Sequence, residues 1–262
     1  MTIMHGAAIV GQNRQLARDV FLLSLQAPEL ARAAAPGQFL MLRVTSGPEP
    51  LLARPFSIHA VEGDDVGVLY RVVGRGTRLL AQATAGQRLE LWGPLGRGFD
   101  LALERPLLVA GGMGIAPLRF AAQRLTARGA RPRLLCGLAS ATGLGGLVEA
   151  VDECLTAQSC AVSWVTEDGS LGERGLVTAL LDRALEGVDG VLCCGPMAML
   201  RAVAEACGRQ GVACQVSLEA PMACGVGACL GCVIPAADGG YLRACQEGPV
   251  LPAAAVDWPR LA

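Results

Sequence analysis

Four cysteines near the end of the chain constrain it more than any other feature. They are Cys224, Cys229, Cys232 and Cys245, spaced C-x4-C-x2-C-x12-C. The first three intervals are those of a plant-type [2Fe–2S] centre, and a later cysteine completes the ligand set. A loop around such a centre must turn tightly and point backbone N–H groups at the sulfurs, so we expect positive φ angles at its glycines. These are Gly225, Gly227 and Gly231.

Zinc and disulfides are the other chemistries that four cysteines can serve. Structural zinc sites usually show two C-x2-C pairs, whereas only Cys229 and Cys232 form one here. Disulfides need an oxidising compartment, and nothing else in the chain indicates export. The spacing therefore predicts one-electron chemistry at a [2Fe–2S] cluster, with a zinc site as the main alternative.

Composition excludes several classes of function. The 262 residues carry a net charge of −1, so the chain offers no basic surface for nucleic acid or for an anionic membrane. The longest uncharged run, residues 220–237, holds three of these cysteines, three glycines and two prolines, which argues against a membrane-spanning helix. No cationic segment precedes an apolar stretch at the N-terminus, where the first arginine is Arg14, and this argues against a signal peptide. We therefore expect a cytoplasmic protein whose 11 cysteines are reduced.

The first hundred residues have the pattern of short strands joined by turns. Alternating or β-rich runs are separated by Pro, Gly and Asp turn residues, with little helical periodicity. The runs cover residues 38–44, 56–60 and 66–73. This pattern predicts a small antiparallel β-barrel over residues 1–100.

Further along, buried strands alternate with amphipathic helices. We expect strands at 107–110, 134–138, 162–166 and 188–194, and helices at 115–128, 144–155, 176–185 and 197–208. This order predicts a parallel, doubly wound α/β domain over residues 101–212. A last strand at 215–219 begins a small C-terminal cluster-binding region, residues 213–262.

Two motifs of the predicted barrel suit a flavin dinucleotide. In the run Arg54–Ser57, the arginine can hold a pyrophosphate in a bidentate manner and the serine hydroxyl can reach a flavin ring edge. Gly74 and Gly76 allow backbone N–H groups to approach a phosphate, and Thr77 can cap a helix there. Each motif by itself also fits an ordinary turn of a β protein.

Two further motifs follow strands of the predicted α/β domain. Gly111, Gly112 and Gly114 stand between a strand and a helix, where a glycine turn places the helix N-terminus against a pyrophosphate. Cys194 and Gly195 stand at the end of another strand, at the edge of the sheet where ligands bind. A tight turn and a buried packing cysteine are the alternative interpretations of these two motifs.

Hydrolytic and phosphoryl-transfer motifs are absent from the sequence. It contains no Ser–His–Asp set, HExxH helix or P-loop, and its histidines are His5 and His59. Because hydride transfer to a flavin needs no protein base, we predict that His59 packs or forms a hydrogen bond rather than acting as a catalytic base.

In this order, the motifs resemble the ferredoxin–NADP reductase superfamily, and most closely its branch of electron-transfer subunits of class 1B dihydroorotate dehydrogenases. The segments 92–99 and 244–250 extend the resemblance to nearly the whole chain. It implies an FAD-binding barrel, an NAD-binding α/β domain and a [2Fe–2S] region that contacts a partner. By this resemblance, FAD would be held by Arg54, Pro55, Phe56, Ser57, Leu69, Tyr70, Arg71, Gly76 and Thr77. NAD would be bordered by Gly111, Gly112, Gly114, Cys194 and Gly195, and the cluster ligands would be Cys224, Cys229, Cys232 and Cys245.

The resemblance also implies an oxidoreductase function in pyrimidine biosynthesis. An FMN-containing catalytic subunit would oxidise dihydroorotate, and this chain, in a heterotetramer with it, would pass the electrons to NAD+. The chemistry is consistent, because nicotinamide accepts electrons in pairs, a cluster passes them singly, and a flavin converts between the two. Residues 139–142 offer no Arg or Lys for a 2′-phosphate, which favours NAD over NADP.

Two other functions remain open at this point. The same cofactors could serve a hydrogenase, a sulfide reductase or a ferredoxin–NADP oxidoreductase. A zinc-stabilised nucleotide-binding regulatory module without redox turnover is the alternative of a different class.

Overall fold

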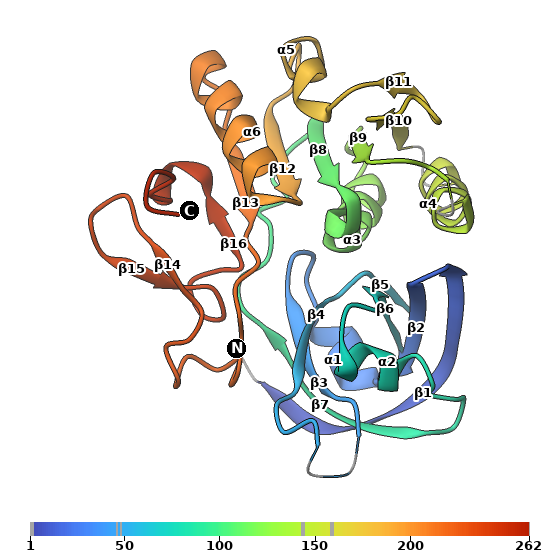
Figure 1. The fold of residues 1–262 in the computed structure, drawn as a ribbon. Helices are drawn as coiled ribbons and strands as arrows, with labels where there is room; N and C mark the ends of the chain where they lie inside the picture. Colours follow the sequence, from blue (N-terminus) through green and yellow to red (C-terminus); the bar gives the residue numbers. More distant parts are fainter. Residues whose placement is uncertain (1–2, 46, 48, 143–144, 158–159, 262) are drawn as a thin grey trace.

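Seven antiparallel strands form a curled sheet in the N-terminal part of the chain (Figure 1). The computed structural model describes residues 3–45, 47, 49–142, 145–157 and 160–261. The strand order is β4-β3-β7-β1-β2-β6-β5. The strands are β1 (Met4–Ala17), β2 (Val20–Gln26), β3 (Phe39–Arg43), β4 (Arg54–Ser57), β5 (Ala60–Glu62), β6 (Asp65–Arg71) and β7 (Arg88–Leu95).

The two edges of this sheet meet because the chain joins them directly. β4 and β5 are the edge strands, yet only Ile58 and His59 separate them in sequence. The Ile58 N–H donates to the Gln38 carbonyl at 3.0 Å, and the His59 N–H donates to the Gly67 carbonyl at 2.8 Å. The sheet therefore closes into the predicted barrel, and two short helices, α1 (Pro28–Ala33) and α2 (Arg75–Leu80), accompany it.

A second seven-stranded sheet, of order β11-β10-β9-β8-β12-β13-β16, lies above the barrel in Figure 1. All its pairs are parallel except the one between β13 and β16. The strands are β8 (Pro106–Gly111), β9 (Arg133–Leu138), β10 (Ala161–Thr166), β11 (Glu173–Arg174), β12 (Gly190–Cys194), β13 (Cys214–Ser217) and β16 (Val250–Pro252). Its helices are α3 (Ile115–Ala127), α4 (Gly145–Ala157), α5 (Leu181–Ala184) and α6 (Met197–Gln210), with 3-10 turns η1 (Gly112–Gly114) and η2 (Val177–Leu180).

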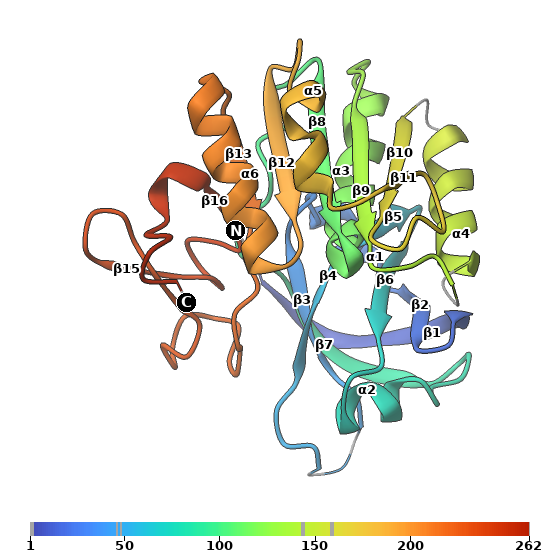
Figure 2. The ribbon, with the colours of Figure 1, turned by 45° about the horizontal axis from the view of Figure 1, so that its top comes forward.

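Helices cover both faces of this parallel sheet (Figure 2). Alternate residues of β8 point to opposite faces: Leu108 packs in one core with α3 and α4, and Leu107 packs in another with α5 and α6. The predicted doubly wound α/β fold is confirmed. The connection changes direction between β8 and β12, and a crevice at the carboxyl ends of such a strand pair is where ligands bind in this architecture.

The C-terminal segment lies beside both sheets (Figure 1). It contains a hairpin of β14 (Val233–Pro235) and β15 (Tyr241–Arg243), followed by β16 and a 3-10 turn, η3 (Ala253–Ala255). Because β16 pairs with β13, this segment adds an edge strand to the parallel sheet, which the sequence pattern did not indicate. The predicted domain limits at residues 100 and 212 stay predictions.

Several predicted elements differ in detail. The helix expected near 176–185 is present over residues 177–184, but its first half is the 3-10 turn η2 and only its second half, α5, is α-helical. The strand expected at 56–60 is broken by the barrel-closing link at 58–59. The prediction that Thr77 caps α2 is confirmed: Thr77 is the third residue of the helix, and its hydroxyl accepts the backbone N–H groups of Val73 and of the N-cap residue Gly74. Leu144, the expected start of the next helix, lies outside the described residues.

Candidate functional site

The β14–β15 hairpin brings two of the four cysteines together. Cys232 precedes β14 and Cys245 follows β15, and the Ala244 N–H donates to the Cys232 carbonyl at 2.9 Å. The two sulfurs lie 3.2 Å apart, and both residues are buried. Cys224 and Cys229 lie in the loop that leads to the hairpin, where Cys229 is exposed.

Backbone N–H groups in this loop point at sulfur, as the sequence predicts for a cluster loop. The Gly227 N–H donates to Cys245 Sγ at 3.1 Å, and the Val226 N–H donates to Cys224 Sγ at 3.5 Å. Positive φ angles occur at Gly225 (71°) and Gly227 (78°). The prediction for Gly231 is wrong, since Leu230 takes the left-handed conformation instead, with φ of 57°.

The protonation of these thiols follows their surroundings. Burial raises the pKa of Cys224, but hydrogen bonds from the backbone N–H groups of Val226 and Cys229 outweigh it and bring the pKa to about 6. Burial, and after it the Cys232 thiol, raises the pKa of Cys245 to about 12. Among the residues that the structure describes, no three His, Cys, Asp or Glu side chains are close enough together to hold one metal ion. The donor set and the N–H···S bonds nevertheless suit an iron–sulfur cluster, whose ligands are thiolates.

The cysteine loop is fixed to the barrel. Trp92 of β7 donates its indole N–H to the Cys224 carbonyl at 3.2 Å. A side chain at Gly225 would lie 2.6 Å from Met41 Cγ of β3, so the loop backbone lies directly on the barrel wall. The candidate cluster ligands therefore sit beside β3, the neighbour of the strand that carries Arg54–Ser57.

The barrel brings the predicted FAD residues Arg54 and Gly76 into contact. A methyl group at Gly76 would lie 2.6 Å from Arg54 Nε, so the guanidinium lies against the first turn of α2. Arg54 also donates to the Leu52 carbonyl. Pro55 and Ser57 are half-buried, and the Ser57 hydroxyl has no hydrogen bond to any residue that the structure describes.

The predicted FAD residues on β6 point in different directions. Tyr70 is 2% exposed, its ring stacks on Phe21 at 5.6 Å and meets the edge of Phe56 at 5.8 Å, and its hydroxyl donates to Asn13 at 3.1 Å. The Tyr70 and Phe56 rings therefore belong to the barrel core. Leu69 is buried towards the parallel sheet, whereas Arg71 is exposed.

The predicted nucleotide residues meet at the point where the parallel sheet changes direction. Gly114, at the end of η1, lies so close to β12 that a Cβ would be 2.0 Å from the Cys194 carbonyl oxygen. A Cβ on Gly195 would lie 2.9 Å from Gly111 Cα. Gly112, with φ of 54°, has open space where its side chain would be. The two motifs thus form one surface at the carboxyl ends of β8 and β12, as expected for a dinucleotide site.

Comparison with known proteins identifies the family. Residues 219–257 match the model of the iron-sulfur cluster binding domain of dihydroorotate dehydrogenase B. The electron transfer subunit of dihydroorotate dehydrogenase B (NAD(+)) from Caldanaerobacter subterraneus subsp. tengcongensis is 38% identical, over 93% of this chain and 94% of that protein. The subunit of the same name from Desulforamulus reducens is 36% identical, again over 93% and 94%.

The chain belongs to the family of dihydroorotate dehydrogenase B electron transfer subunits.

Solved structures place this electron transfer subunit among the ferredoxin–NADP reductase folds. An NADH-dependent reduced ferredoxin-NADP oxidoreductase superposes with a TM-score of 0.84 at 27% identity, over 97% of this chain and 91% of that one. A ferredoxin NADP+ reductase from Neisseria gonorrhoeae shares the fold, with a TM-score of 0.66 at 17% identity. The predicted fold class and family are confirmed. The family favours a function with dihydroorotate dehydrogenase over one with a hydrogenase, a sulfide reductase or a ferredoxin–NADP oxidoreductase. In the described part of this subunit, no helix is long and apolar enough to cross a membrane.

Proposed function

We propose that this chain is the electron transfer subunit of a dihydroorotate dehydrogenase B, in which an FMN-containing catalytic subunit oxidises dihydroorotate and this chain delivers the electrons to NAD+. Relatives that carry this name match it over nearly their whole length. The role would place the chain in pyrimidine biosynthesis.

The arrangement of the three candidate sites carries the proposal. The cysteine loop is bonded to β7 through Trp92, and β3 lies between β7 and the strand that carries Arg54 and Ser57. The turn at Gly112 joins β8 of the parallel sheet to α3, and it touches β6 of the barrel. Electrons that enter at the cysteines would thus reach the nucleotide through the barrel site, without leaving the protein.

Each group would be held by residues that suit it. Bound FAD exchanges hydride with a nicotinamide and single electrons with a cluster. Arg54, held against Gly76, would bind the FAD pyrophosphate, and the free Ser57 hydroxyl would meet the ring system. The open backbone at Gly112 would admit the nicotinamide nucleotide. These assignments need no proton donor from the protein.

A carboxylate beside residues 139–142 supports NAD over NADP. The Ser170 hydroxyl donates to Asp168 at 2.7 Å, and Ser140 lies 3.4 Å from the Ser170 oxygen. Hydrogen bonds from Ser170 and then from Ser140 lower the pKa of Asp168 to about 2. A permanently charged carboxylate next to the segment after β9 would repel a 2′-phosphate.

We also propose a heterotetramer with the catalytic subunit, and a cytoplasmic location. The cysteines that the structure describes are all free thiols, which agrees with a reducing compartment.

Anaerobic co-purification with an FMN-type dihydroorotate dehydrogenase, followed by an assay of dihydroorotate-dependent NAD+ reduction, tests the proposal. We expect activity only when both proteins are present. If the chain carries flavin and iron and reduces dyes with NADH, but neither binds nor serves that partner, the pyrimidine role is wrong.

Replacement of a cluster ligand separates the steps. Cys229→Ser should abolish electron delivery from the partner and leave NADH-driven dye reduction at the flavin unchanged, because that reaction does not pass through the cysteines. Cys160→Ser, a buried cysteine outside the loop, is the matched control. If Cys229→Ser loses both reactions equally, the assignment of electron delivery to the cysteines and of dye reduction to the flavin is wrong.

A further inference from the structure

One face of α3 is docked on the barrel. Ala116, Arg119, Phe120 and Gln123 lie at i, i+3, i+4 and i+7 and so share a face of the helix. Phe120 is fully buried and belongs to the barrel core rather than to the core of the parallel sheet. α3 is therefore anchored by a side chain that the barrel encloses.

Polar contacts along the same face fix the helix to the barrel-closing segment. Arg119 Nη2 donates to Glu62 Oε1 at 2.9 Å, and Gln123 Nε2 donates to the Val61 carbonyl at 3.3 Å. In the first turn of α3, the Ala116 carbonyl lies 2.9 Å from His59 Nδ1. Of these contacts, the one at His59 lies nearest to the glycine turn where α3 begins.

His59 sits at a rigid point of the barrel. It belongs to the two-residue link that joins the sheet edges, and its own N–H is bonded to Gly67 in β6. It follows Ser57 by two residues, so a displacement of His59 is passed directly to the end of β4.

Ala116 holds the matching position on the other side. It follows Gly114 by two residues, and Gly114 lies against the Cys194 carbonyl. The hydrogen bond between His59 and Ala116 thus links the strand proposed for the flavin to the turn proposed for the nicotinamide nucleotide.

The imidazole has one protonation state available for this bond. A carbonyl oxygen only accepts, so Nδ1 carries the hydrogen. The His59 residue is 7% exposed, and burial, followed by the charge of Arg119, lowers its pKa to about 3. The ring therefore stays neutral, and the bond is constant, across the physiological range.

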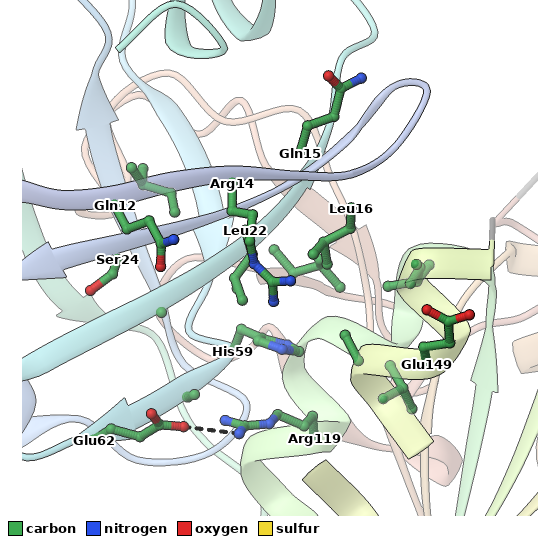
Figure 3. A pocket seen from close by; sticks show the side chains of 18 of the residues that line it. Gln12, Arg14, Gln15, Leu16, Leu22, Ser24, His59, Glu62, Arg119 and Glu149 are labelled. Carbon is green, nitrogen blue, oxygen red and sulfur yellow. Dashed lines mark hydrogen bonds and ion pairs between the residues drawn. The ribbon is translucent and has the colours of Figure 1, made fainter. Parts of the chain in front are cut away.

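A cleft of about 580 Å³ lies beside this bond (Figure 3). The side chains of Arg14, His59, Arg119 and Glu149 border it. Beyond the cleft, the two parts touch again where Gly146 of α4 approaches the Leu16 carbonyl. The space separates these two contacts, so near the glycine turn the barrel is held by the α3 face and by β6, which touches η1.

We propose that His59 is a positioning residue for hydride transfer, holding the nucleotide-binding turn at a fixed distance from the flavin strand through its hydrogen bond to Ala116. The inference rests on the proposed function. Hydride donor and acceptor must approach to about 3–3.5 Å, and a misplacement of about 1 Å costs roughly a hundredfold in rate.

The test compares His59→Phe and His59→Asn in the FAD-loaded full chain, with stopped-flow measurement of flavin reduction by NADH. Phenylalanine fills the space without a donor, whereas the asparagine amide places an N–H close to the position of Nδ1. We expect His59→Phe to lower the hydride-transfer rate constant about ten- to a hundredfold, with the dissociation constant of NADH changed less than about twofold. His59→Asn should recover most of the rate. His5→Asn, at the exposed histidine bonded to Glu90, is the matched control.

Two results would overturn the inference. One is a wild-type rate constant for hydride transfer in His59→Phe. The other is an equal fall of this rate constant in His59→Phe and His59→Asn, which would mean that the shape of the imidazole matters and its hydrogen bond does not. If His59→Phe does not fold, His59→Gln replaces it, since its longer amide reaches past the Nδ1 position and should be slower than His59→Asn. A wild-type chain whose flavin NADH does not reduce would contradict the proposed function itself, and is thus a separate outcome.

Discussion

At the scale of single residues, the contact between Arg54 and Gly76 is the one that a small substitution tests most directly. Gly76 has no need of a positive φ, so alanine is tolerated by its backbone. Its methyl group, however, would lie 2.6 Å from Arg54 Nε and 3.0 Å from Cζ, which displaces the guanidinium. Charge-assisted hydrogen bonds contribute about 1.5–3 kcal/mol, so we expect Gly76→Ala to weaken FAD binding about ten- to a hundredfold.

The measurement is a titration of the apoprotein with FAD, followed by the quenching of flavin fluorescence. Gly208→Ala in α6 is the matched control, because no atom lies within 4 Å of a methyl group there and the residue is far in sequence from the barrel motifs. Equal FAD affinity in both variants would contradict the assignment of Arg54 to the pyrophosphate.

At the scale of elements, the docking of α3 gives the protein a predictable response to acid. The folded state lowers the pKa of His59 from 6.5 to about 3, because the charged ring would be buried and would face Arg119. The contribution of neutral His59 to the free energy of unfolding is therefore fully present above pH 6.5, and it is lost as the pH falls from 6.5 towards 3. The loss approaches about 1.4 kcal/mol per pH unit below pH 6.5.

Urea unfolding at pH 7.0 and pH 5.5 tests this. The wild type should lose about 1 kcal/mol more unfolding free energy than His59→Asn over this interval. Glu62, Glu149 and Arg14, which also border the cleft, are common to both proteins and cancel in the difference. If the wild type and His59→Asn lose the same unfolding free energy between the two pH values, burial does not hold His59 neutral.

Elements with a strong local pattern could be predicted from the sequence, and those built from distant contacts could not. The strand at 107–110 is a continuous apolar run because both its faces are covered, and a glycine turn marks the start of the helix that follows. Burial alternates along β1 from Met4 to Gly11, but half of the strand is exposed and the residue types there do not alternate between apolar and polar, so the sequence did not mark it. β16 has three residues and depends on pairing with β13.

The same distinction holds for the sites. The cysteine ligands and the glycine turns were predictable because spacing and turn chemistry are local. The bond from His59 to Ala116 joins residues 57 positions apart, so the sequence predicted only that His59 packs or forms a hydrogen bond, not where its partner lies. Gly231 was assigned a positive φ on residue type, but the loop takes the left-handed conformation at Leu230, a residue that rarely adopts it.

At the scale of the whole molecule, the exposed end of the cysteine loop is the surface on which we expect the catalytic subunit to dock. Cys229 is exposed, and beside it in sequence Val226, Leu230 and Val233 are 40%, 59% and 44% exposed. Apolar side chains grouped around an exposed redox ligand favour a partner over solvent. Electron transfer also requires the partner to approach this ligand closely.

Leu230→Asp tests the docking surface without weakening the fold, since Asp tolerates the left-handed backbone at this position better than Leu does. Burial of a leucine contributes about 1.5–3 kcal/mol, so we expect the affinity for the catalytic subunit to fall about ten- to a hundredfold or more. Reduction of a dye by NADH should be unchanged. Leu176→Asp, 57% exposed on the parallel-sheet domain, is the matched control and should bind normally. Calorimetric titration with the catalytic subunit measures the affinity of both variants. Normal binding by Leu230→Asp would place the interface elsewhere on the molecule, away from the exposed cysteine loop.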